Sequence, residues 1–213
     1  LVAASQTLPY VLFSLPAGAL VDRWNRKAVM IGCDLARFLA LGSIPLAAVL
    51  ARVTVIQLYV AAAVAGTAYV FFSVAEVSSL ARVVTAAQLP RATAANATVG
   101  SGAMLLGPGL GGLIISLARS TLVGAVLAYL VDGASYLLSA ISLRLIRTPF
   151  QAVRAPHERT SVTTEVTEGL RFLWEQRQLR ALALLNLGTN VFLAPADLAV
   201  IVLARGALHA DVR

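Results

Sequence analysis

The sequence predicts an all-α membrane protein, and its composition and its long apolar runs lead to this prediction. Hydrophobic residues make up 59% of the 213-residue chain and charged residues only 13%, against about 25% charged residues in an ordinary soluble domain. The mean hydropathy is +0.82. This composition excludes a water-soluble globular protein, and it equally excludes a disordered chain, because disorder requires low hydrophobicity.

Six apolar stretches are long enough to cross a bilayer, which requires about 20 residues of helix. They are residues 1–21, 28–50, 53–80, 92–118, 121–143 and 181–203. Lipid offers no partners for backbone N–H and C=O groups, so stretches of this length must be helices. Strands of a membrane barrel would be about half as long and would alternate strictly between apolar and polar residues.

Basic residues lie mainly in alternate connections between these stretches. They are Arg23, Arg26 and Lys27; Arg82 and Arg91; and Arg144, Arg147, Arg154, Arg159, Arg171, Arg177 and Arg180. The other connections carry only Arg52, Arg119 and Arg205. By the positive-inside rule the richer connections face the cytoplasm. The formal charge of +7 therefore indicates membrane orientation, and we expect no nucleic-acid partner.

The chain would then begin on the outer side of the membrane without a signal sequence. A preceding helix would place the N-terminus in the cytoplasm, so we expect the chain to start inside a larger protein. Cys33 lies alone in an apolar run, and the two histidines, His157 and His209, lie far apart. Neither a disulfide nor a metal site is expected.

A polar region separates the fifth stretch from the sixth. Within it, apolar residues recur at steps of three and four residues opposite charged ones, which is typical of an amphipathic helix. The apolar residues are Val166, Leu170, Leu173 and Trp174, and the charged residues are Glu165, Glu168, Arg171 and Glu175. This helix lies on the cytoplasmic membrane surface, or it is a solvated linker helix without lipid contact.

The first cytoplasmic connection, residues 18–27, carries a specific pattern. Its defining positions are Gly18, Asp22, Arg23, Arg26 and Lys27. A small residue allows two helices to approach closely, and an acidic residue near a helix start interacts favourably with the helix dipole. The cations hold the loop in the cytoplasm. The segment resembles the signature loop between the second and third helices of the major facilitator superfamily.

A second motif lies in the fourth stretch, where Gly107, Pro108, Gly111 and Gly112 form the pattern Gly-Pro-x-x-Gly-Gly. Proline kinks a helix, and the glycines present a flat face for close packing. The motif is similar to one in the fifth helix of the drug/proton antiporters of that superfamily. This chain has Ala103 where the family pattern usually has a further glycine.

Residues 6–10, 131–137 and 168–174 resemble the macrolide and siderophore exporters of the superfamily. Matched to the family order, the six stretches are helices two to seven of twelve. The resemblance implies a partial bundle with three regions. Residues 1–146 would form the N-terminal half-bundle without its first helix, 147–180 a cytoplasmic linker with the amphipathic helix, and 181–213 the first helix of the C-terminal half.

Ionisable side chains inside spans are functional candidates, because their burial costs about 2.5 to 3.5 kcal/mol at a helix centre. Asp34 and Arg37 are three residues apart on one helix face and can neutralise each other. Together with Glu76 they lie in the inner half of the bilayer, and we expect them to form one network with the signature loop. This network would act as a latch on the cytoplasmic gate or would contact the substrate.

Asp132 lies near the middle of its span without a counter-charge close in sequence. Leaving water favours the neutral form of a carboxyl group, so Asp132 is our candidate for proton coupling, or it bonds to a neighbouring helix. Asn186, Asn190 and Asp197 form a polar stripe along the sixth stretch. In the family this helix lines the central cavity, so they are candidates for substrate contact, or they join helices.

The resemblance implies a secondary active transporter that exports drug-like or siderophore-like molecules by alternating access, with protons as the coupling ion. Its partners would be the lipid bilayer, the small-molecule substrate, protons and the helices missing from this chain, and it would need no cofactor. We expect it in a bacterial inner or plasma membrane.

Two alternatives remain. One is a truncated fragment that does not transport, because the partners of the glycine face and of the signature loop would belong to absent helices. The other is an intramembrane enzyme. This would require paired aspartates, a histidine cluster, or a serine with a base at membrane depth, and the stretches show none with suitable spacing.

Overall fold

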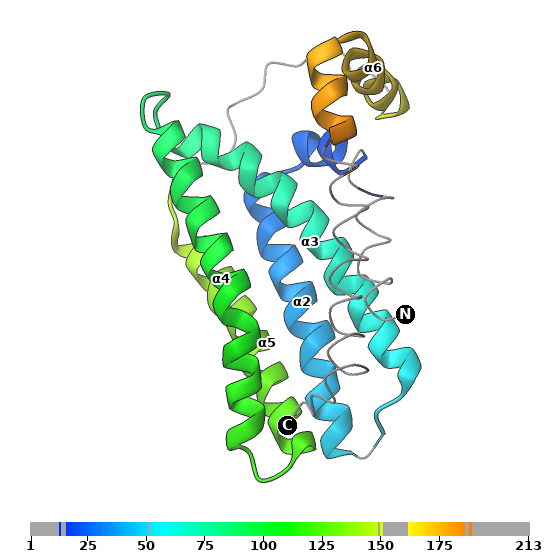
Figure 1. The fold of residues 1–213 in the computed structure, drawn as a ribbon, viewed down its shortest axis with the longest axis vertical. Coiled ribbons are helices and arrows are strands. Elements are labelled where there is room, and N and C mark those ends of the chain that lie inside the picture. Colours follow the sequence, from blue (N-terminus) through cyan, green and yellow to red (C-terminus); the bar gives the residue numbers. More distant parts are fainter. Residues whose placement is uncertain are drawn as a thin grey trace, which may run out of the picture. The chain divides into compact units, whose positions relative to one another are not determined.

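The computed structural model describes residues 13, 16–50, 52–148, 150, 162–185 and 188, and its described elements are helices (Figure 1). The chain divides into two units, Leu1–Val162 and Thr163–Arg213. The first contains α2 (Arg26–Val49), α3 (Val55–Val83), α4 (Leu89–Leu117) and α5 (Thr121–Leu145), and α6 (Val162–Glu175) lies at the boundary of the second.

These four helices of the first unit are long and apolar enough to span a membrane. They confirm the stretches predicted at 28–50, 53–80, 92–118 and 121–143. The predicted stretches 1–21 and 181–203 lie mostly outside the described residues, although 16–23 and 177–185 are helical where they are described.

Short polar side chains fix where three of the four helices begin. The backbone N–H of Ala28 donates to Asn25 Oδ1 at 3.1 Å at the start of α2. Thr54 and Ser120 cap α3 and α5 in the same way. Such caps satisfy backbone donors that have no partner inside the helix. The helix α4 has Pro90 in its first turn instead, a position where proline needs no N–H partner.

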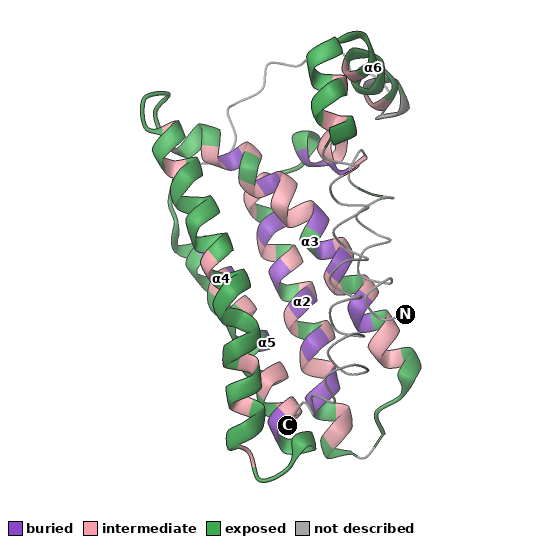
Figure 2. Cartoon of the chain, in the orientation of Figure 1, coloured by how far each residue is buried: buried purple, intermediate pink, exposed green. Residues whose placement is uncertain are grey.

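The core of the first unit lies around α2, which packs mainly against α5 and α3, whereas α4 packs mainly against α5. One buried cluster contains Val21, Met30, Ala75, Leu143 and Phe150, and a second contains Leu41, Ile44 and Ala61. No residue of α4 is buried, and Figure 2 shows this helix exposed along nearly its whole length. In the described chain α4 therefore presents most of its surface outward.

One glycine is required where α5 turns back along α4. A Cβ atom on Gly124 would lie 2.6 Å from the Cα atom of Ile115 and 3.2 Å from the Cβ atom of Ala118. Real Cβ atoms do not approach a backbone this closely, so only glycine permits this hairpin to close. Gly133, where α5 crosses α2, has more room, because its nearest atom is a ring carbon of Phe38 at 3.8 Å.

The helix α6 is the amphipathic helix that the sequence predicts. Val166 and Leu173 are partly buried, whereas Leu170 and Trp174 are exposed. Arg171 Nε pairs with Glu175 Oε1 at 2.7 Å. The guanidinium of Arg180 lies 5.9 Å from the Trp174 ring centre. The placement of α6 at a membrane surface remains a prediction.

Candidate functional site

The signature loop is bonded to the ends of two neighbouring helices. Arg26 Nη2 pairs with Asp22 Oδ1 at 2.6 Å, and its Nη1 donates to the backbone oxygen of Ser78 in α3 at 3.2 Å. Lys27 Nζ donates to the backbone oxygens of Arg144 at 3.2 Å and Ile146 at 2.5 Å. These two oxygens lie at the C-terminal end of α5, where carbonyls lack partners inside the helix and attract cations.

This arrangement corrects one expectation from the sequence. The partners of the signature loop were expected in helices absent from the chain, and this is wrong for Arg26 and Lys27. Arg26 reaches a carbonyl of α3 and Lys27 reaches carbonyls at the end of α5, because the start of α2 lies beside both helices. Arg23 is exposed, and no described residue lies within 4 Å of a Cβ built on Gly18.

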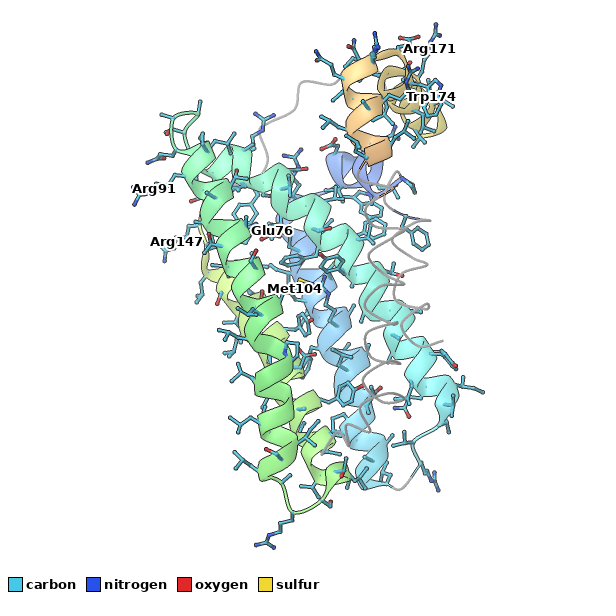
Figure 3. The ribbon with its side chains drawn as sticks, viewed as in Figure 1. Glu76, Arg91, Met104, Arg147, Arg171 and Trp174 are labelled. Carbon is cyan, nitrogen blue, oxygen red and sulfur yellow. The ribbon has the colours of Figure 1, made fainter. Side chains whose placement is uncertain are left out.

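Aromatic side chains support the loop from one side. The rings of Trp24 and Phe71 are stacked, with centres 6.3 Å apart and planes at 20°. Phe13 contacts the same Phe71 ring at 6.3 Å. Arg91 and Arg147 project from this same end of the bundle (Figure 3). The basic connections predicted to be cytoplasmic therefore share one end of the first unit.

Inside the bundle, α2 carries a buried ion pair. Arg37 Nη1 lies 3.7 Å from Asp34 Oδ1, and the two side chains are only 7% and 1% exposed. Three atoms of the pair, Asp34 Oδ2 and Arg37 Nε and Nη2, are buried without a hydrogen-bond partner among the described residues. A charge pair this deep is costly to desolvate unless other groups stabilise it.

Three aromatic rings surround the guanidinium of Arg37. Its central carbon lies 5.0 Å from the ring centre of Phe72, 5.1 Å from that of Tyr136 and 5.7 Å from that of Tyr69. A cation over an aromatic face gains about 0.5 to 2 kcal/mol, and more as water is excluded. Rings from α3 and α5 thus stabilise a cation that belongs to α2.

Asp132 also belongs to this site. It is exposed on α5 and precedes Tyr136, whose ring lies 5.1 Å from the Arg37 guanidinium, by one helical turn. The cation on this face of α5, Arg37, belongs to another helix, so the local sequence around Asp132 does not show it. Glu76 lies on α3 (Figure 3) and is partly buried. It forms no ion pair or hydrogen bond with any described residue, so the structure brings together Asp34 and Arg37 but not Glu76.

The remaining candidates do not meet this site. A Cβ built on Gly107, Gly111 or Gly112 would meet no described residue within 4 Å, and Pro108 is exposed with them on α4. Asn186, Asn190 and Asp197 lie outside the described residues. Within the described ranges, no group of three metal-ligating side chains occurs. An apolar groove of about 780 Å³ runs between α2 and α3, bounded by residues that include Trp24, Cys33 and Phe71.

Sequence reasoning missed Tyr69, Phe72 and Tyr136. A signal for them exists, because Tyr69 and Phe72 are three residues apart and Tyr136 follows Asp132 by four, so each pair shares a helix face. Their common target, Arg37, follows only from how the helices pack.

The sequence profile of the Major Facilitator Superfamily matches residues 1–206. The chain belongs to this superfamily. It is 29% identical over 208 residues to the multidrug efflux pump Tap of Mycolicibacterium fortuitum, an alignment that covers 92% of this chain and 48% of that protein. The corresponding pump of Mycobacterium bovis is 25% identical over 205 residues, which cover 92% of this chain and 47% of the pump.

A further relative is the uncharacterized MFS-type transporter YfiS of Bacillus subtilis, which is 29% identical over 81% of this chain and 40% of its own length. The chain thus spans about half the length, or less, of these curated relatives. No solved structure matches it significantly.

This membership confirms two predictions. One is the family, which the signature loop indicated, and the other is the partial all-helical bundle. With its membrane-spanning helices, it also establishes a multi-pass membrane protein. The family and its efflux relatives support a transport role rather than an enzymatic one.

Proposed function

We propose that this chain works within a secondary transporter that exports small molecules, coupled to protons and operating by alternating access. The observation that carries the proposal is the similarity to multidrug efflux pumps over 92% of the chain. No phosphate-binding loop of the Gly-x-x-x-x-Gly-Lys type occurs in the sequence, so an ion gradient is the simpler energy source.

The bonds of the signature loop support rigid-body rocking. In alternating access, one half of the protein moves against the other around a central site. Arg26 and Lys27 join the start of α2 to α3 and to the end of α5. A half-bundle tied in this way at its cytoplasmic end would move as one body. In this proposal residues 1–146 belong to that half, 147–180 link it to the other half, and 181–213 begin the other half.

The exposed surface of α4 supports a role in contact between the halves. This helix has no buried residue, and its Gly107, Gly111 and Gly112 have open space beside them. Close helix packing in membranes uses such small residues. We assign this face to contact with helices outside this chain.

We assign substrate contact to Asn186, Asn190 and Asp197. The bacterial relatives favour the bacterial plasma membrane as the location.

Export can be tested in everted membrane vesicles that contain the intact transporter. In such vesicles export becomes uptake, so an interior-acid gradient should drive accumulation of ethidium and doxorubicin, and an uncoupler should abolish it. Vesicles without the protein provide the control. Uptake that persists after uncoupling would contradict proton coupling, and no uptake of either compound would contradict multidrug export.

The 213-residue chain by itself is the second case to test. Because it spans about half the length of the relatives, we expect proteoliposomes that hold only this chain to show no ethidium flux. Substrate-dependent flux sensitive to an uncoupler would show that the chain is sufficient for transport.

A further inference from the structure

Arg37 lies between carboxyl groups of two different helices. It pairs with Asp34 of its own helix at 3.7 Å, and its guanidinium lies 5.1 Å from the ring of Tyr136, which follows Asp132 by one turn of α5. Within the described part of the chain, neither carboxyl group forms an ion pair with any other cation. One positive and two negative groups would leave a net charge of minus one inside the hydrocarbon, which is unfavourable. Binding of a single proton makes the group neutral.

The packing of α5 on α2 places Asp132 on the side of Arg37. Gly133, the next residue, lies against Phe38, which follows Arg37 in α2. Tyr136, one turn further along α5, stands 5.1 Å from the Arg37 guanidinium. Residues four apart share a helix face, so Asp132 lies on the same face of α5 as Tyr136, the face that meets Arg37. Two independent contacts therefore support this placement.

Burial differs between the two carboxyl groups. Asp34 is 1% exposed and Arg37 is 6% exposed, whereas Asp132 is exposed. The other titratable groups around them are Cys33 on α2, Tyr69 on α3, Glu76 one turn beyond Phe72 on α3, and Tyr136 on α5. The charged residue of α4, Arg91, lies in the first turn of that helix. The two carboxyl groups therefore lie at different depths of the described bundle, with Asp34 inside it and Asp132 at its surface.

We propose that Asp34, Arg37 and Asp132 form one protonation centre that holds a single proton shared between the two carboxyl groups. When the proton is on Asp132, Arg37 pairs with Asp34, as in the structure. When the proton moves from Asp132 to Asp34, Arg37 pairs with the Asp132 carboxylate instead, and the total charge stays zero. Arg37 Nε and Nη2 have no hydrogen-bond acceptor among the described residues, so the guanidinium has donors left for a second carboxylate. This centre specifies which residues would carry the proton in the proposed coupling. Its role in transport rests on the proposed export, whereas the shared proton itself does not.

Infrared difference spectroscopy tests this proposal on the intact transporter in lipid nanodiscs, because it measures the C=O band of protonated carboxyl groups. At neutral pH we expect one protonated carboxyl from the centre. Asp34→Asn and Asp132→Asn should each abolish that contribution, because either variant leaves Arg37 with one carboxylate. Arg37→Gln should raise it roughly twofold, because two carboxyl groups then lack their cation.

Controls separate the centre from other carboxyl groups. Asp22 lies in the signature loop, so Asp22→Asn should leave the band unchanged. When Glu76→Gln is combined with Asp34→Asn, the band should fall by the same amount as when Asp34→Asn is added to the unaltered protein. Arg37→Lys keeps the cation and should retain one protonated carboxyl. If Arg37→Gln does not fold, Arg37→Lys and the two aspartate variants still decide the result.

A band lost in Asp132→Asn but kept in Asp34→Asn would overturn the proposal, since Asp132 would then hold its proton alone. A band unaffected by either variant, or one that disappears when sodium is added, would overturn it as well. The band does not depend on export. Failure here would leave the export proposal standing, and absence of drug uptake would not alter the band.

Discussion

Replacing Gly124 with alanine should destabilise the protein, because the new methyl group would overlap the backbone of α4. Its Cβ atom would lie 2.6 Å from Ile115 Cα and 3.0 Å from the Ile115 backbone oxygen, and neither atom can move without shifting the helix. Overpacking typically lowers the free energy of unfolding by about 1–3 kcal/mol, occasionally more. Replacement of glycine by alanine within a helix raises it by about 1 kcal/mol. We therefore expect a net loss of up to about 2 kcal/mol.

Gly133 offers a matched control in the same helix. Its nearest neighbour is a Phe38 ring carbon at 3.8 Å, an ordinary van der Waals distance. Gly133→Ala should therefore keep the propensity gain without a clash and raise stability by up to about 1 kcal/mol. Unfolding of the detergent-solubilised transporter, followed by circular dichroism, measures both variants. Equal stabilities for the two alanine variants would refute the close approach of α4 and α5.

Two further predictions concern the loop and α6. Lys27→Ala should lower the free energy of unfolding by about 1–2 kcal/mol, because the end of α5 loses a charged donor, whereas Arg82→Ala at an exposed site should change it by less than about 0.5 kcal/mol. Equal effects would exclude the capping role of Lys27. In a Trp24→Phe background, brominated lipids should quench the fluorescence of Trp174 if α6 lies on the bilayer, and unquenched fluorescence would favour a solvated linker helix.

Much of the first unit could be predicted from the sequence because a bilayer sets the length of its helices. The predicted stretch 28–50 corresponds to α2 at Arg26–Val49, and the caps Thr54 and Ser120 stand directly before α3 and α5. The pair Asp34–Arg37 was also predictable, because its partners are three residues apart on one helix. Local spacing is sufficient for each of these features.

Contacts between helices could not be predicted in this way. Lys27 meets α5 carbonyls more than a hundred positions along the chain, and Arg37 meets Tyr136 on another helix. Such contacts depend on how α2 and α5 rotate and cross, which a periodicity of apolar residues does not determine. For the same reason Glu76 was grouped with Asp34 and Arg37 by depth alone, although the structure does not join it to them.

The direction of transport and the side from which protons enter both depend on the orientation of the spans in the membrane. A cysteine placed at Val53 lies in the short connection between α2 and α3, and one placed at Ala87 lies between α3 and α4. Both positions are exposed, and Cys33→Ser would remove the native thiol. In intact cells, a membrane-impermeant maleimide should label Val53→Cys and leave Ala87→Cys unlabelled until the membrane is opened. Labelling of Ala87→Cys from outside would contradict the account.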